Sequence, residues 1–202
     1  SNELSMSPKD PMSAAQKLYE QGLITYMRTD ASHYSIDFIE TVKTHIKKKF
    51  NSDRYISSVI FLLSSTTNSN TQETSSAHES IRPTNIKVET IEDMASSGFT
   101  PREIKVYKLI WRITMESCMS SAIYSKMKCT VCSPLSEKWI FMHDAVKPLF
   151  MGWKAVKYGV NITNKCLNDD QTEETDGDRE GFVTGEYEYL SLLNPGQAIS
   201  FE

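Results

Sequence analysis

Residues 100–118 read TPREIKVYKLIWRITMESC, and this stretch decides the fold of the first half of the chain. Thr100, Pro101 and Glu103 have the pattern of a capping box with proline at the first helical position, which marks a helix start. Apolar residues then recur at helical spacing at Val106, Tyr107, Ile110, Trp111, Met115 and Cys118. We therefore expect a helix of about 18 residues whose apolar stripe faces a core.

Two more helices are expected before this one. In the first, Asp10 caps the helix, Pro11 takes the first helical position, and Gly22 lies just past the C-terminus. Its apolar positions are Met12, Ala15, Leu18 and Tyr19. The second begins at Ser35 and ends at the lysine run 47–49, which suits the negative end of a helix dipole. A solvated helix end is the favoured interpretation of that run over a phosphate-binding grip.

The segments between these helices are less regular. Residues 23–27, LITYM, form a short β-favouring run, and residues 55–63, YISSVIFLL, are expected to form a buried strand. Residues 64–76 are rich in Ser, Thr and Asn and predict a polar loop. In the motif AHESIRPT that follows, Pro83 forces Arg82 into an extended backbone conformation.

The pattern changes near residue 120. The runs YSKMKCTVCS, EKWIFMHDAV, GWKAVKYGV and EYEYLSLL, at 124–133, 137–146, 152–160 and 186–193, are alternating or β-rich. Gly, Pro and Ser separate them, so they predict antiparallel sheet. The sequence thus predicts an α+β chain, with a mostly helical domain at 1–118 and a β-rich domain at 119–202.

Composition narrows the functional classes. The net charge of the chain is −4, yet residues 1–115 carry 14 basic against 13 acidic residues, while 116–202 carry 8 against 13. Any phosphate-facing surface is therefore expected in the first half. The sequence shows no apolar run of the roughly 20 residues that a membrane span needs, and no signal peptide opens it. Four irregularly spaced cysteines favour a reducing, intracellular location over secretion.

Tyr26, Arg28 and Asp30 stand two residues apart, so on a strand they would share one face. A guanidinium beside a phenol favours the phenolate and can hold a phosphate, and Asp30 can orient it. The triplet therefore suits attack by Tyr26 on a phosphodiester. A buried tyrosine beside a structural arginine–aspartate pair is the commoner explanation, so the spacing leaves both open.

Other polar groups give weaker signals. His78, close to Arg82, can donate to a phosphate or move a proton, although a solvated histidine is commoner. Cys129 and Cys132 have CxxC spacing, but no second ligand pair accompanies them, so metal binding is not favoured. The acidic run 168–180 lacks the ligand order of a calcium loop and is expected to be a solvated loop.

Three motifs, taken in order, resemble those of the type IA DNA topoisomerases. They are AAQKLYEQGLITYMRTD at 14–30, AHESIRPT at 77–84 and VYKLIW at 106–111. FMGWKAV at 150–156 is similar to a strand turn of that family's gate domain. Met27, between the tyrosine and the arginine, resembles the topoisomerase I branch, since proline is usual there in the topoisomerase III branch.

The resemblance implies a mechanism. Tyr26 would attack a phosphate of single-stranded DNA, form a 5′-phosphotyrosyl link and later religate the strand, relaxing negative supercoils without ATP. Arg28 matches the family arginine beside the scissile phosphate. His78 matches a histidine that contacts DNA near the active site and assists proton transfer. Asp30 and Arg82 match family positions with local orienting or DNA-contact roles.

The chain departs from the family motifs at two small residues. Ala31 stands where the family usually has Ser, and Ser80 stands where it usually has Ala. We expect little loss from either change. The insertion at 64–76 lengthens the segment between the motifs, which affects where His78 is placed.

We expect the family's acidic Toprim domain to be missing from this chain, and no Glu and Asp-x-Asp-x-Glu set to occur here that could hold Mg²⁺. We therefore expect no metal ligands here, and an isolated chain that is a monomer and inactive. Its expected partners are single-stranded or negatively supercoiled DNA and the missing Toprim and gate segments. The alternative is a single-strand-binding module that keeps the scaffold without chemistry. A tyrosine recombinase fits poorly, because it needs a wider set of Arg and His residues.

Overall fold

The computed structural model describes Ser7 and residues 9–63, 78–92, 98–133, 136–159 and 184–198. These form two compact units. The first comprises Ser1–Ser121 and Gly152–Tyr158, and the second comprises Ala122–Met151 and Gly159–Glu202. The described residues contain helices and one antiparallel sheet, which confirms the α+β class.

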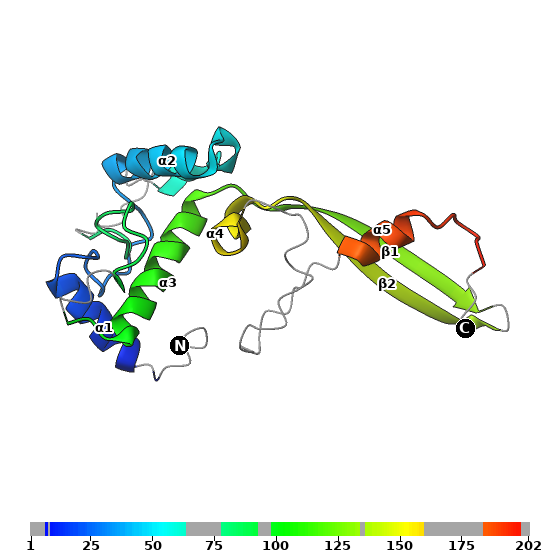
Figure 1. The fold of residues 1–202 in the computed structure, drawn as a ribbon, viewed down its shortest axis with the longest axis horizontal. Helices are drawn as coiled ribbons and strands as arrows, with labels where there is room; N and C mark the ends of the chain where they lie inside the picture. The colour runs from blue at the N-terminus through cyan, green and yellow to red at the C-terminus, as the bar shows by residue number, and fades with distance from the viewer. Residues whose placement is uncertain are drawn as a thin grey trace, which may run out of the picture. The chain divides into compact units, whose positions relative to one another are not determined.

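The helix α3, Pro101–Cys118, organises the first unit and contacts both α1 and α2 (Figure 1). The predicted capping box is confirmed, because the Glu103 carboxylate accepts hydrogen bonds from the backbone and hydroxyl of Thr100. Its buried side chains are Val106, Tyr107, Trp111, Thr114, Met115 and Cys118. The aromatic residues on this stripe also find polar partners, since Trp111 Nε1 donates to the carbonyl of Ile86 at 2.8 Å. The stripe is therefore core, as its spacing predicts.

The helix α1, Lys9–Glu20, starts before the predicted position, so Asp10 lies inside its first turn. It buries Ala14, Ala15 and Leu18. Tyr19, which the sequence groups with the apolar positions, is 41% exposed. Gly22 has φ +70° and ends the helix as predicted, a conformation that costs glycine little.

The helix α2, Ile36–Phe50, starts directly after Ser35, as predicted, and ends at Asn51 with φ 51°. Its buried face consists of Phe38, Ile39, Val42, Ile46 and Phe50. In the lysine run, Lys47 pairs with Asp53 and Lys49 pairs with Glu89. Two of the three lysines thus have acidic partners within the protein.

The buried strand expected at residues 55–63 is wrong. The segment forms two 3-10 turns, η2 at Asp53–Tyr55 and η3 at Ile60–Leu63, with a single bridge from Ile56 to Met119. Ser52 caps η2 by accepting from the amide of Arg54 at 3.2 Å. A short apolar run can be buried by turns as well as by a sheet, and here the local cap selects turns.

The second unit contains the hairpin of β1, Ile123–Ser133, and β2, Ser136–Phe150, with α5, Thr184–Ser191, packed on β2. The first two predicted β runs are therefore confirmed. The last is wrong, because residues 186–191 belong to α5, whose Tyr187 hydroxyl contacts Ser125 Oγ at 2.7 Å. Glu and Tyr alternate in this run, which is a pattern typical of a strand, although the residues form a helix.

The run at 152–160 also differs from its predicted strand, because it folds as η6, Gly152–Lys154, followed by α4, Ala155–Tyr158. Gly152 has φ +51°, and a Cβ there would lie 2.5 Å from the carbonyl oxygen of Ser120. The amide of Trp153 donates to that same oxygen at 2.8 Å. This close backbone approach turns the chain out of an extended conformation.

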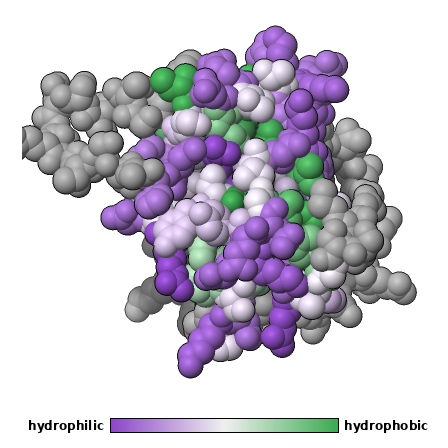
Figure 2. Space-filling model, turned by 90° about the vertical axis from the view of Figure 1, so that its left-hand side faces the viewer, coloured by the Kyte–Doolittle hydropathy of each residue, from purple (hydrophilic) through white to green (hydrophobic). Residues whose placement is uncertain are grey.

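The face of the molecule drawn in Figure 2 carries mostly hydrophilic side chains, with hydrophobic ones in small patches between them. None of the helices in the described part of the chain is long and apolar enough to cross a membrane.

Candidate active site around Tyr26

The segment before Tyr26 pairs with the segment after His78. Ile24 forms an antiparallel bridge with Pro83, flanked by hydrogen bonds from Thr25 N–H to the Arg82 carbonyl at 2.9 Å and from Thr84 N–H to the Leu23 carbonyl at 3.0 Å. The pairing ends there, so residues 26–30 are not on a strand as the spacing suggests. The pairing of residues 23–25 with residues 82–84 brings the motif of Tyr26 next to the motif of His78.

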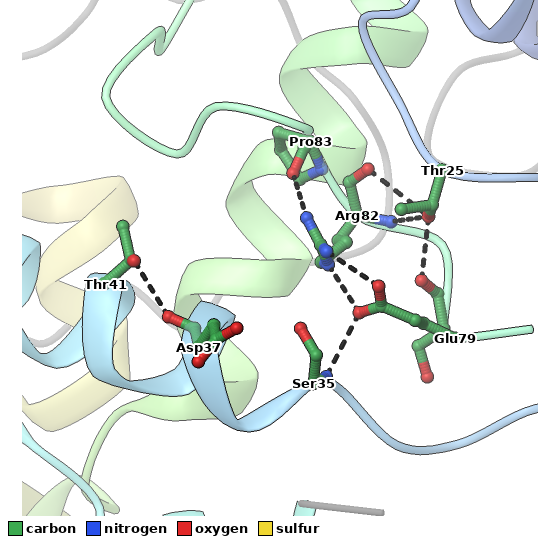
Figure 3. A network of polar contacts seen from close by, with 8 residues as sticks. Thr25, Ser35, Asp37, Thr41, Glu79, Arg82 and Pro83 are labelled. Carbon is green, nitrogen blue, oxygen red and sulfur yellow. Dashed lines mark hydrogen bonds and ion pairs between the residues drawn. The ribbon is translucent and has the colours of Figure 1, made fainter.

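Side-chain hydrogen bonds also connect these two segments (Figure 3). The Thr25 hydroxyl donates to the Ser80 carbonyl and accepts from the Arg82 amide, both at 2.9 Å. Ser80 also donates its amide to the His33 carbonyl at 2.9 Å. Thr25, which precedes Tyr26, and Ser80, two residues after His78, are thus hydrogen-bonded to each other. These bonds hold the segment of Tyr26 against the segment of His78.

The aromatic rings of Tyr26 and His78 are in contact, with centroids 4.9 Å apart and planes tilted by 36°. Tyr26 is half-buried and His78 is exposed. Within the described part of the chain the Tyr26 hydroxyl forms no hydrogen bond. The structure therefore brings together two of the three predicted catalytic residues.

Arg28 and Asp30 are both exposed, and Met27 between Tyr26 and Arg28 is buried at 6% exposure. No ion pair joins Arg28 to Asp30 among the described residues, so the orienting role predicted for Asp30 is not seen here. An exposed guanidinium two residues from the phenol remains open to an anion.

Arg82 is held inside the protein by Glu79. Its Nε and Nη2 donate to the two carboxylate oxygens at 2.9 and 2.8 Å, its Nη1 donates to the Pro83 carbonyl at 3.1 Å, and it packs 4.0 Å over the ring of Phe38. The carboxylate also accepts from the amide of Ser35 at 3.1 Å. The Arg82 side chain is 12% exposed. The DNA-contact role of Arg82 stays a prediction, since these contacts are internal.

The environment of Glu79 favours its charged form. Partial burial acts to raise the pKa of Glu79, but the hydrogen bonds from Arg82 and from the Ser35 amide outweigh it and lower that pKa. Sequence reasoning assigned no role to Glu79, Thr25 or Ser80. The opposite charges of Glu79 and Arg82 were an available signal, whereas the backbone partners of Thr25 and Ser80 leave no trace in the sequence.

The two departures from the family motifs face each other. The hydroxyl of Ser80 donates to the carbonyl of Ala31 at 2.8 Å. Together with the bonds to His33 and Thr25, Ser80 contacts both ends of the segment that contains Tyr26. The side chain gained at one position therefore contacts the backbone of the other.

Among the described residues, no group of three or more His, Cys, Asp or Glu is placed to hold a metal ion. Cys129 is half-buried on β1, opposite His143, and Cys132 is exposed opposite Ile140. The expectation that the chain lacks an Asp-x-Asp-x-Glu spacing is wrong, because residues 176–180 read DGDRE. Those residues lie outside the described ones, as do the rest of the run 168–180 and the loop 64–76.

A tyrosine in contact with a histidine, beside an exposed arginine, defines a candidate site for attack on a phosphate. The family model described as DNA topoisomerase matches residues 1–185. The chain therefore belongs to the DNA topoisomerase family, and its motifs are those of the type IA members.

Named relatives agree with this. The chain is similar to DNA topoisomerase 1 of Buchnera aphidicola, with 36% identity over 81% of this chain and 18% of the relative. It is similar to DNA topoisomerase 1 of Escherichia coli, with 37% identity over 65% of this chain and 14% of the relative. Full-length topoisomerase I of Thermotoga maritima has a similar fold, with a TM-score of 0.56 and 26% identity over 83% of this chain and 24% of that one. The chain thus spans less than a fifth of the two DNA topoisomerase 1 relatives and about a quarter of the Thermotoga maritima protein.

Proposed function

We propose that this chain carries the nucleophile of an enzyme that cleaves and rejoins single-stranded DNA and so relaxes negative supercoils. The observation that supports this most is the contact between Tyr26 and His78, made by two motifs that are far apart in the sequence. Membership of the family supports DNA as the substrate, and an enzyme of this kind acts inside the cell, where DNA is.

The chemistry follows from the residues. A phenol has a pKa of about 10, so it attacks a phosphate only when its proton is removed or its anion is stabilised. The phenolic oxygen of Tyr26 would attack phosphorus. A bond between that oxygen and phosphorus forms while the bond between phosphorus and the 3′-oxygen of the preceding nucleotide breaks. We propose that His78, whose ring contacts that of Tyr26, relays the proton between the phenol and that leaving oxygen. We propose that the exposed Arg28 neutralises the charge that develops on the phosphate. Attack by the 3′-hydroxyl reverses each step, so no ATP is required.

In the ranges that the structure describes, no group of three or more His, Cys, Asp or Glu is placed to hold a metal ion. We propose that any Mg²⁺ required for cleavage and religation is bound by a Toprim segment of the whole enzyme, and that the 202 residues alone are inactive and monomeric.

The test is covalent capture. The longer polypeptide that contains these residues is incubated with a labelled single-stranded oligonucleotide and denatured, and the protein-linked label is measured. Wild type is expected to form the adduct and Tyr26→Phe none, while Tyr158→Phe, at another exposed tyrosine of the first unit, matches wild type. An adduct in the Tyr26→Phe protein would remove the assignment. DNA binding with no adduct in wild type would favour the binding module.

A further inference from the structure

Tyr19 lies at the edge of the candidate site. It is in the last turn of α1, where Leu18 is fully buried but Tyr19 is 41% exposed. Its ring meets Tyr26 at a centroid distance of 5.4 Å and an interplanar angle of 70°, an edge-to-face contact. Because Tyr26 in turn contacts His78, three rings form a continuous row across the site.

Packing alone does not account for Tyr19. A ring that is 41% exposed leaves much of its apolar surface in water, and its hydroxyl forms no hydrogen bond within the described part of the chain. The core contacts of α1 come from Ala14, Ala15 and Leu18 instead. What distinguishes Tyr19 is its contact with the candidate nucleophile on one side and its open surface on the other.

We propose that Tyr19 is a stacking surface for a nucleobase of single-stranded DNA, next to the phosphate that Tyr26 attacks. A phosphate at the Tyr26 oxygen places the bases of the adjoining nucleotides beside the row of rings. Every base has a π face, so an exposed aromatic ring binds bases of single strands without reading their sequence. This inference rests on the proposed function, because it takes the attacked phosphate to lie at Tyr26.

Arg28 and Tyr19 would then bind different parts of the same strand, Arg28 a backbone phosphate and Tyr19 a base. The exposed guanidinium of Arg28 meets the backbone charge, and its contribution falls as salt is added. The stacking contribution of Tyr19 depends on the ring and on the presence of a base. A tyrosine that merely supports Tyr26 would instead be indifferent to whether the strand carries a base.

The experiment measures the affinity of the 202-residue chain for fluorescent oligo(dT) at low ionic strength, by anisotropy. The same strand is then used with one abasic position moved along it. Tyr19→Leu keeps the apolar bulk and helical preference without a π face, and Tyr19→Phe keeps the ring. We expect Tyr19→Leu to weaken binding about tenfold and Tyr19→Phe to match wild type. One abasic position should weaken wild type by a similar factor and leave the Tyr19→Leu protein unchanged.

Tyr158→Leu is the matched control, because Tyr158 is 43% exposed and belongs to the same compact unit. Equal losses in Tyr158→Leu and Tyr19→Leu would overturn the proposal. So would Tyr19→Leu binding within twofold of wild type, an abasic profile that is the same in both proteins, or a wild-type chain that binds no oligo(dT). Failure of the proposed function is separate, since it appears as a missing adduct while the loss of binding in Tyr19→Leu persists.

Discussion

Replacing Glu79 by glutamine removes the anion that pairs with Arg82 and ties this segment to the amide of Ser35, just before α2. The carboxylate accepts three hydrogen bonds, two from Arg82 and one from the amide of Ser35. Glutamine offers one acceptor oxygen and turns an amide N–H toward a guanidinium. Because Arg82 is 12% exposed, its charge is left largely out of water and without its partner.

The size of the effect follows from these contacts. Hydrogen bonds to charged groups contribute about 1.5–3 kcal/mol each, but Glu79 is 30% exposed, so solvent screening reduces the gain. We expect Glu79→Gln to lower the free energy of unfolding by about 2 kcal/mol, and the urea midpoint by roughly 1 M. Unfolding is followed by tryptophan fluorescence, to which buried Trp111 contributes.

The effect has a predictable pH dependence. Since the folded-state pKa of Glu79 lies below its usual 4.5, its stabilisation is fully present above the unfolded pKa and is lost as pH falls through the folded value. The difference between wild type and Glu79→Gln should therefore be largest near neutrality and shrink as the pH falls below 4.5. Glu89→Gln is the control, because Glu89 is 49% exposed in its pair with Lys49 and should cost less than about 1 kcal/mol. A Glu79→Gln protein as stable as the control, or a difference that persists in acid, would refute the reasoning.

Further substitutions, with matched controls at two of the sites, test the fold. Gly152→Ala should lower the free energy of unfolding by about 2 kcal/mol or more, because the added Cβ would lie 2.5 Å from backbone atoms of Ser120 and Ser121. The control is Gly98→Ala, also at positive φ but with nothing within 4 Å of the added Cβ, which should cost about 1 kcal/mol. Thermal melts that show the larger loss for Gly98→Ala would contradict this. Tyr107→Phe should cost about 1–2 kcal/mol by removing the donor to the Val88 carbonyl. Burial raises the pKa of Tyr107 to about 12, so in an ultraviolet titration this variant should lack the last tyrosine to ionise. Ser80→Ala should lose about 1 kcal/mol in urea unfolding, while Ser80→Thr, which keeps the hydroxyl, should lose less.

Elements that depend on local interactions could be predicted from the sequence. The start of α3 was read from Thr100, Pro101 and Glu103, because a capping box is formed by residues three apart. The end of α1 was read from Gly22, because its positive φ is a property of one residue. The buried face of α3 followed from the spacing of apolar residues, since a helix repeats every 3.6 residues whatever its surroundings.

Short segments could not be predicted in the same way. Residues 55–63, 152–158 and 186–191 were expected as strands and are turns or helices. In such runs the difference between helical and extended local preferences is small, so tertiary contacts decide. For residues 152–158 the deciding contact is the approach of Gly152 to the backbone of Ser120, and for α5 it is the packing on β2.

The candidate site divides along the same line. The sequence by itself determined which residues we propose to carry the chemistry, since the motifs point to Tyr26, Arg28 and His78. It did not determine that Tyr26 and His78 touch, or that Glu79 holds Arg82 away from solvent. Those facts depend on the pairing of residues 23–25 with residues 82–84. Backbone hydrogen bonds between distant segments are not encoded in any side chain, so only the tertiary structure decides where they form.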